Sequence, residues 1–258
     1  MCYAWRDLAI PVGSRGYLAA LCTGDCRGPT VVVCHGFSGT KEGRGLAIPM
    51  AEALWDRGYS CVLFDFTGCG GSPGPSEDIT LSGQVEDLRA VVDFVILEGA
   101  SPVVVVGRSL GAATALCEAA LDPRVAGVCA WACPVDLQEV FRLPLAVQET
   151  LEPGASLFIP TPGGGFRVKH DFFLDLQRHD ILRCGAALAP RPLLVIQAGH
   201  DEVVPSTHGE SLFAAAGRPK ELWAIGGADH RFSHRHQEVW EVLFSWLARH
   251  FSPGSGRD

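Results

Sequence analysis

The segment that decides the fold is VVVVGRSLG, residues 103–111. Its four valines predict a strand buried on both faces, because parallel strands that are covered by helices are apolar throughout. The helix-forming sequence AATAL follows at once, at residues 112–116. A strand, a sharp turn and a helix around Gly-x-Ser-x-Gly are the context in which the serine acts as a nucleophile. We therefore expect Ser109 to be catalytic, with a purely structural turn as the alternative.

The turn is expected to force Ser109 into a strained backbone conformation that only small neighbours permit. Gly107 and Gly111 flank Ser109, because a side chain at either place would meet the adjoining strand or helix. The serine hydroxyl is then expected above the start of a helix, where backbone N–H groups stabilise developing negative charge. The N–H of Leu110 is the first predicted donor to such a charge.

Composition limits the classes of protein to consider. The chain has 258 residues, of which 47% are hydrophobic and 19% charged, and this predicts a single α/β domain over residues 1–258. A net charge of −8 without a basic cluster argues against nucleic acid or an acidic membrane surface as a partner. No apolar run approaches the roughly 20 residues that span a bilayer, and residues 1–7 do not have the pattern of a signal peptide.

The ten cysteines leave two interpretations open. Several lie in apolar segments, where free cysteine behaves as a small hydrophobic residue, and this favours a reducing, cytoplasmic location. Cys22 and Cys26 flank a turn, so a disulfide between them is the alternative. His230, His234 and His236 lie near one another, but the nearby carboxylates and cysteines lack the spacing of metal ligands. We expect neither a metal nor a cofactor.

Strands alternate with helices along most of the chain. Residues 8–12 and 17–22 predict an antiparallel pair, and buried strands are expected at 30–34, 61–66, 103–106, 125–132, 193–197 and 221–225. Helical spacing of apolar residues is clearest from Thr80, a predicted N-cap, to Gly99. The expected fold is a mostly parallel central sheet flanked by helices.

Residues 134–189 interrupt this alternation with prolines and a run of glycines. An insertion of this length is unusual in a compact domain unless it is functional. We expect a small cap over the carboxyl edge of the sheet, with a disordered excursion as the alternative. Phe166, Phe172 and Phe173 are the predicted substrate-contacting residues of the cap.

A serine nucleophile needs a base and a group that orients the base. Asp201 follows the strand at 193–197 and is the predicted orienting acid, with Glu202 as its rival. His230 follows the strand at 221–225 and is the predicted general base. Both lie where an open α/β sheet places its functional loops, at the carboxyl ends of strands.

The order Ser…Asp…His resembles that of the α/β-hydrolase superfamily. The motifs that carry the resemblance are HGFSGTK (35–41), DFTGCGGS (65–72), GRSLG (107–111), GHDEVVP (199–205) and DH (229–230). Within the superfamily, the chain is most similar to small bacterial cinnamoyl (feruloyl) esterases and to relatives of serine aminopeptidase-like lipases. The resemblance implies an acyl-enzyme on the serine and the N–H of Phe37 as second oxyanion donor. His35 is expected to brace the loop that carries Phe37, with a role as a second base as the alternative.

The predicted function is a serine carboxylesterase for small to medium carboxylic esters, phenylpropanoid esters among them. Other possibilities are a peptidase or amidase, a thioesterase or carbon–carbon hydrolase, and a non-catalytic protein of the same fold that binds a small ligand. The expected partner is a small-molecule ester. A homodimer is compatible with the sequence, which does not determine the oligomeric state.

Overall fold

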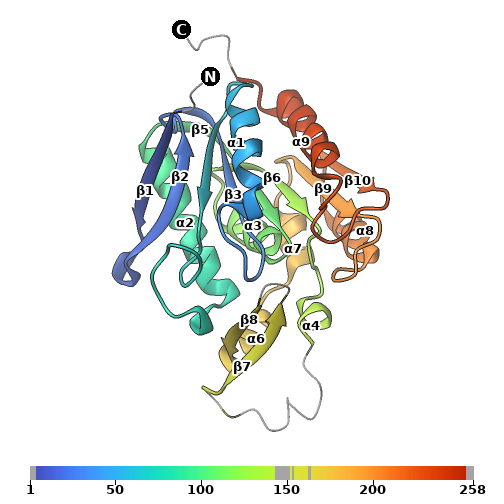
Figure 1. The fold of residues 1–258 in the computed structure, drawn as a ribbon. Helices are drawn as coiled ribbons and strands as arrows, with labels where there is room; N and C mark the ends of the chain where they lie inside the picture. Colours follow the sequence, from blue (N-terminus) through green and yellow to red (C-terminus); the bar gives the residue numbers. More distant parts are fainter. Residues whose placement is uncertain (1–3, 143–151, 153, 162–163, 254–258) are drawn as a thin grey trace.

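The structure is a computed structural model that describes residues 4–142, 152, 154–161 and 164–253. Its centre is an eight-stranded sheet in the order β1-β2-β4-β3-β5-β6-β9-β10 (Figure 1). The strands are β1 (Trp5–Pro11), β2 (Tyr17–Thr23), β3 (Gly28–Cys34), β4 (Ser60–Phe64), β5 (Ala100–Arg108), β6 (Val125–Trp131), β9 (Leu193–Ala198) and β10 (Lys220–Ile225). β1 and β2 pair antiparallel with each other, β2 pairs antiparallel with β4, and the other pairs are parallel. The predicted fold class is confirmed.

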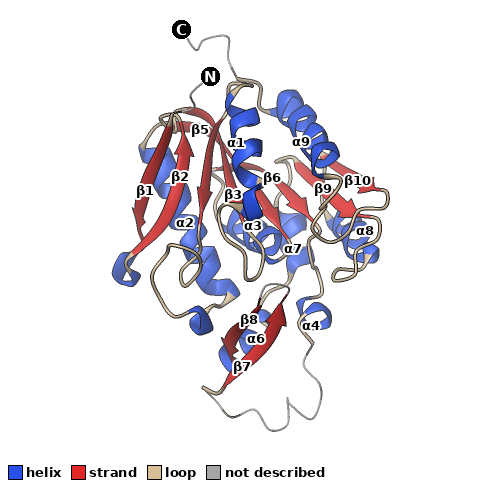
Figure 2. Cartoon of the chain, in the orientation of Figure 1, coloured by secondary structure: helices blue, strands red, loops and turns tan. Residues whose placement is uncertain are grey.

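Helices cover both faces of the sheet (Figure 2). One face packs against α1 (Ala47–Trp55) and α9 (His236–His250). The other packs against α2 (Leu81–Leu97), α3 (Leu110–Leu121), α7 (Ile181–Ala187) and α8 (Ser206–Ala215). Thr80 caps α2 as predicted, since its side chain accepts a hydrogen bond from the N–H of Gly83. Each face therefore has its own hydrophobic core.

Strand β5 contributes to both cores. Val103 and Val105 face the α2 and α3 side, whereas Val104 and Val106 face the α1 and α9 side. Successive side chains of a strand point to opposite faces, so the even-numbered positions of β5 belong to the α1 and α9 face. This alternation determines where the side chains near Ser109 point.

The segment 134–189 contains elements of two kinds. A separate antiparallel pair, β7 (Ser156–Thr161) and β8 (Gly164–Lys169), lies below the main sheet in Figure 1 with α4 (Leu137–Val140) and α6 (His170–Leu176). Helix α7, by contrast, packs against α3 and α8 beside the main sheet. Residues 143–151, 153 and 162–163 of the predicted cap, with three of its prolines, lie outside the described residues.

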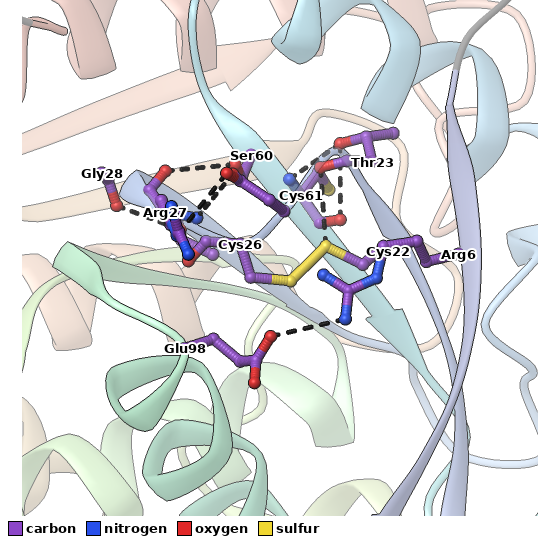
Figure 3. The surroundings of a disulfide bond; sticks show 11 residues. Arg6, Cys22, Thr23, Cys26, Arg27, Gly28, Ser60, Cys61 and Glu98 are labelled. Atoms are coloured by element: carbon purple, nitrogen blue, oxygen red, sulfur yellow. Dashed lines mark hydrogen bonds and ion pairs between the residues drawn. A yellow bond between two sulfur atoms is a disulfide. The ribbon is translucent and has the colours of Figure 1, made fainter.

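Cys22 and Cys26 are joined by a disulfide at the turn between β2 and β3 (Figure 3). Both cysteines are buried, and their Cα atoms are 6.8 Å apart. The interpretation in which every cysteine is free is therefore wrong for this pair. The seven other cysteines in the described part of the chain are unbridged. No helix built from the described residues is long and apolar enough to cross a membrane.

Candidate active site

Ser109 lies on a sharp turn between β5 and α3. Its backbone has φ 55° and ψ −125°, which confirms the predicted strained conformation. A Cβ on Gly107 would lie 2.3 Å from the carbonyl oxygen of Gly111, and a Cβ on Gly111 would lie 2.3 Å from that of His35. Only glycine therefore fits at positions 107 and 111, two residues before and two residues after the serine. The Ser109 N–H donates to the carbonyl of Trp131 at 2.8 Å and so holds the turn against β6.

Three side chains from three strand ends form one chain of hydrogen bonds. Ser109 Oγ lies 3.1 Å from Nε2 of His230. Nδ1 of His230 lies 2.9 Å from each carboxylate oxygen of Asp201. Because the Asp201 carboxylate is acceptor-only, Nδ1 carries the proton of a neutral His230, and Nε2 is left to accept from the serine hydroxyl.

The same geometry decides between the two candidate acids. Glu202 accepts a hydrogen bond from the backbone N–H of His230 at 3.2 Å and does not contact the ring nitrogens. Asp201 is held by the backbone N–H groups of Val203 and Val204, which donate to its Oδ1 at 2.9 and 2.7 Å. Asp201 is thus the carboxylate that orients the imidazole.

Two backbone N–H groups near Ser109 are available to a ligand. Leu110 begins α3, and the first N–H groups of a helix have no partner within that helix. Phe37 lies in the loop after β3, which approaches the turn closely: a Cβ on Gly36 would be 3.2 Å from Cβ of Ser109. Within the described residues, neither the N–H of Leu110 nor that of Phe37 has a hydrogen-bond acceptor.

The loop that carries Phe37 is fastened to the loop after β4. The fully buried carboxylate of Asp65 accepts from the backbone N–H of Lys41 at 2.6 Å, from its Nζ at 2.7 Å and from the N–H of Gly71 at 2.9 Å. Burial alone would lower the pKa of Lys41, but its hydrogen bonds to Asp65 and Glu42 outweigh burial and raise it. Sequence reasoning placed Asp65 in the motif DFTGCGGS, directly after a buried strand, but did not predict its role in holding this loop.

His35 braces the same loop, as expected. Its Nε2 accepts from the backbone N–H of Phe66 at 3.2 Å, and its Nδ1 donates to the carbonyl of Gly36 at 2.9 Å. Burial lowers the pKa of His35, so the ring is neutral and both nitrogens are occupied. His35 is therefore not positioned as a second base.

A sequence profile of the alpha/beta hydrolase family matches residues 31–242. The chain belongs to the alpha/beta hydrolase family. It is 34% identical over 209 residues to the uncharacterized protein Rv2307c of Mycobacterium tuberculosis, an alignment that covers 79% of this chain and 63% of the relative. This chain thus spans less than two thirds of that relative's length.

Solved structures share the fold along nearly the whole chain. Est1E from Butyrivibrio proteoclasticus, solved with bound ferulic acid, is 20% identical with a TM-score of 0.83, covering 94% of this chain and 98% of Est1E. The esterase domain of a Rhodothermus marinus protein is 26% identical with a TM-score of 0.73, covering 96% and 99% of the two chains. Both likenesses agree with the fold that the family assignment implies.

The three phenylalanines predicted to contact substrate do not play equal parts in the structure. The Phe37 ring packs against those of Phe166 and Phe172, with centroids 5.0 and 5.5 Å apart. Phe172 is fully buried and also contacts Phe173 and Phe141, so it holds the segment together. Phe166 and Phe173 are half-buried. The aromatic cluster therefore joins β8 and α6 to the loop that carries Phe37.

Proposed function

We propose that this chain is a serine carboxylesterase in which Ser109, His230 and Asp201 are the catalytic triad. The observation that carries the proposal is the continuous hydrogen-bond chain from Ser109 Oγ through the imidazole to the Asp201 carboxylate. A serine hydroxyl is a weak nucleophile, and an adjacent base oriented by an acid is what activates it.

In the proposed reaction, Nε2 of His230 takes the hydroxyl proton while Oγ attacks the ester carbonyl carbon. The carbonyl oxygen becomes an oxyanion that accepts hydrogen bonds from the N–H groups of Phe37 and Leu110. Each such donor is typically worth roughly 3 kcal/mol of transition-state stabilisation. His230 then gives its proton to the departing alcohol, which leaves an acyl group on Ser109. Water, activated by the same imidazole, hydrolyses this acyl-enzyme.

The predicted cap, residues 134–189, is proposed to contribute to the substrate site. The contact of Phe166 with Phe37 supports this, since it places β8 next to a proposed oxyanion donor. Esters of ferulic and related acids are candidate substrates, because Est1E shares the fold and binds ferulic acid. A cytoplasmic location and a homodimer stay predictions.

The test is labelling by a fluorophosphonate probe together with a substrate panel. Wild-type protein should be labelled at Ser109, whereas Ser109→Ala should be folded, unlabelled and inactive. The panel contains nitrophenyl esters of rising chain length, methyl ferulate, an acyl thioester and an aminoacyl anilide. Near-wild-type ester hydrolysis by Ser109→Ala would contradict the assignment, and a preference for the anilide or thioester would replace esterase by peptidase or thioesterase.

A further inference from the structure

A pocket of about 210 Å³ lies on the α1 and α9 face of the sheet. Its lining includes Phe37 and Arg108, which directly precedes Ser109, and the apolar side chains of Trp131, Met50 and Trp240. Arg108 is an even-numbered residue of β5, so its side chain points to this face. The pocket is smaller than the roughly 300–1,000 Å³ of typical ligand sites, so it has room for one part of a substrate.

Three arginines from separate segments line this pocket. Arg108 precedes Ser109, Arg231 follows His230, and Arg44 lies in the 3-10 helix η2 (Gly43–Gly45). Among the residues that the structure describes, no carboxylate forms an ion pair with the guanidinium of Arg108 or Arg231. These two guanidinium groups thus have no direct carboxylate partner there, and Asp201 and Asp229 offset only part of the electrostatic effect on Arg108.

The nearest acidic side chains are already engaged. Asp229 accepts hydrogen bonds from the backbone N–H groups of Arg231 and Ser233, at 3.1 and 2.9 Å. Asp201 is bound to the His230 ring. Lys41, which also lines the pocket, is paired with Asp65. The positive charge that lacks a direct carboxylate partner in the described part of this pocket is therefore that of Arg108 and Arg231.

Such an arrangement is unfavourable for an empty pocket. Burial lowers the pKa of Arg108, and the nearby positive charges of Arg231 and Arg44 lower it further. Like charges gathered in a partly buried place destabilise a fold, and proteins keep such local conflicts mainly at functional sites. An anion in the pocket would relieve the repulsion, and a guanidinium matches the geometry of a carboxylate or phosphate.

The pocket is close to the proposed reacting atoms. A Cβ on Gly36 would lie 3.2 Å from Cβ of Ser109 and 3.4 Å from Nη2 of Arg108, so the serine and the guanidinium border the same point. A group bound by Arg108 would thus lie a few bonds from an ester carbonyl at Ser109. The lining of the pocket also includes Arg108, which precedes Ser109, and Arg231, which follows His230.

We propose that this pocket binds an anionic group, a carboxylate or a phosphate monoester, carried by the ester that Ser109 attacks. The inference rests on the proposed esterase activity and narrows its substrates to acidic esters. Arg108 and Arg231 are specificity-determining residues that hold the anion, and Arg44 adds positive charge to the same pocket.

The kinetic test compares each acidic ester with a neutral ester of similar shape. 4-Nitrophenyl hydrogen glutarate is paired with 4-nitrophenyl valerate, and 4-acetoxybenzoate with its methyl ester, so that the acid lies on the acyl or the alcohol side. We expect kcat/KM to favour the acid in at least one pair by about tenfold or more, as a charge-assisted hydrogen bond allows. Arg108→Met and Arg231→Met should bring this ratio close to one, and Arg108→Lys should keep part of it.

The ratio of acidic to neutral ester is the readout, because any general disturbance of the neighbouring Ser109 or His230 cancels in it. Arg27→Gln is the matched control: it removes one positive charge, its side chain is 76% exposed, and it directly precedes β3 at the other end of the strand from the site. This variant should keep the wild-type ratio. Equal rates for both members of each pair in the wild type, or an acid preference that survives in both methionine variants, would overturn the proposal.

A binding measurement separates this proposal from the esterase proposal. Ser109→Ala is titrated by calorimetry with glutarate and with methyl phosphate, and the tighter ligand identifies the anionic group. Adding Arg108→Met to Ser109→Ala should weaken binding by about tenfold or more. Failure of both anions to bind overturns the anion site. Anion binding by a protein that hydrolyses no ester would retain the site and reject the esterase.

Discussion

Replacing Asp201 by asparagine tests the proposed triad most sharply, because the change preserves size and shape. In the described part of the chain, Oδ1 of Asp201 accepts from two backbone N–H groups as well as from the His230 ring, whereas Oδ2 accepts from the ring alone. In Asp201→Asn, the carbonyl oxygen should therefore take the Oδ1 position. The amide NH₂ then lies at the Oδ2 position and faces Nδ1 of His230.

This places a donor where the native protein has an acceptor. The neutral imidazole then favours a proton on Nε2, and a protonated Nε2 cannot accept the proton of Ser109. The lost charge-assisted hydrogen bond to the imidazolium is worth about 1.5–3 kcal/mol, and the wrong tautomer adds to this. We expect kcat for 4-nitrophenyl butyrate to fall by about a thousandfold to ten-thousandfold, or ~4–6 kcal/mol.

The matched control is Glu202→Gln, whose side-chain carbonyl can still accept from the N–H of His230. Its kcat should stay within about tenfold of wild type, since it loses at most one weak hydrogen bond. Both variants should keep the far-ultraviolet circular dichroism spectrum of the wild type. If Glu202→Gln were the more damaging change, or if Asp201→Asn kept more than about a tenth of wild-type kcat, the assigned acid would be wrong.

Three further predictions concern the loops around Ser109. Asp65→Asn breaks the buried ion pair with Lys41 and should lower the free energy of unfolding by about 3 kcal/mol. It should also lower kcat, and a urea unfolding curve identical to that of the wild type would contradict the reasoning. Burial lowers the pKa of His35 in the folded state, so unfolding lets the ring take up a proton. The free energy of unfolding should therefore decrease as pH falls below 6.5, the usual pKa of histidine. The melting temperature, measured between about pH 5 and 7, should depend less steeply on pH in His35→Asn than in the wild type. Phe166→Ala should shift the preference among nitrophenyl esters while nearly preserving acetate hydrolysis, and equal losses for all esters would mean that the ring only supports the fold.

Much of the fold was predictable because its determinants are local. The strand, turn and helix around Ser109 follow from one apolar run and two glycines, and the structure reproduces them with the expected backbone strain. The parallel sheet follows from uniformly apolar strands. The juxtaposition of Ser109, Asp201 and His230 was also expected from the sequence, because open α/β sheets gather the carboxyl ends of their strands at one edge.

Other features depend on three-dimensional geometry that the sequence does not determine. Asp201 and Glu202 are adjacent, and only the path of their loop decides which carboxylate reaches the ring. The joint position of Arg108 and Arg231 beside one pocket depends on side-chain directions from two distant strands. Residues 134–189 have no simple periodicity, and the packing of α7 against α3 depends on contacts far apart in the chain.

The position of β10 at the edge of the sheet has a consequence for how activity is lost. His230 follows this strand, which pairs only with β9 in the main sheet and keeps Trp223 47% exposed. Edge strands with few buried side chains open at lower free energy than the centre of a domain. Mild denaturant should therefore displace the imidazole from Ser109 before the two cores separate. Inactivation should precede the spectroscopic unfolding transition, and the protein would pass through a folded, inactive and reversible state.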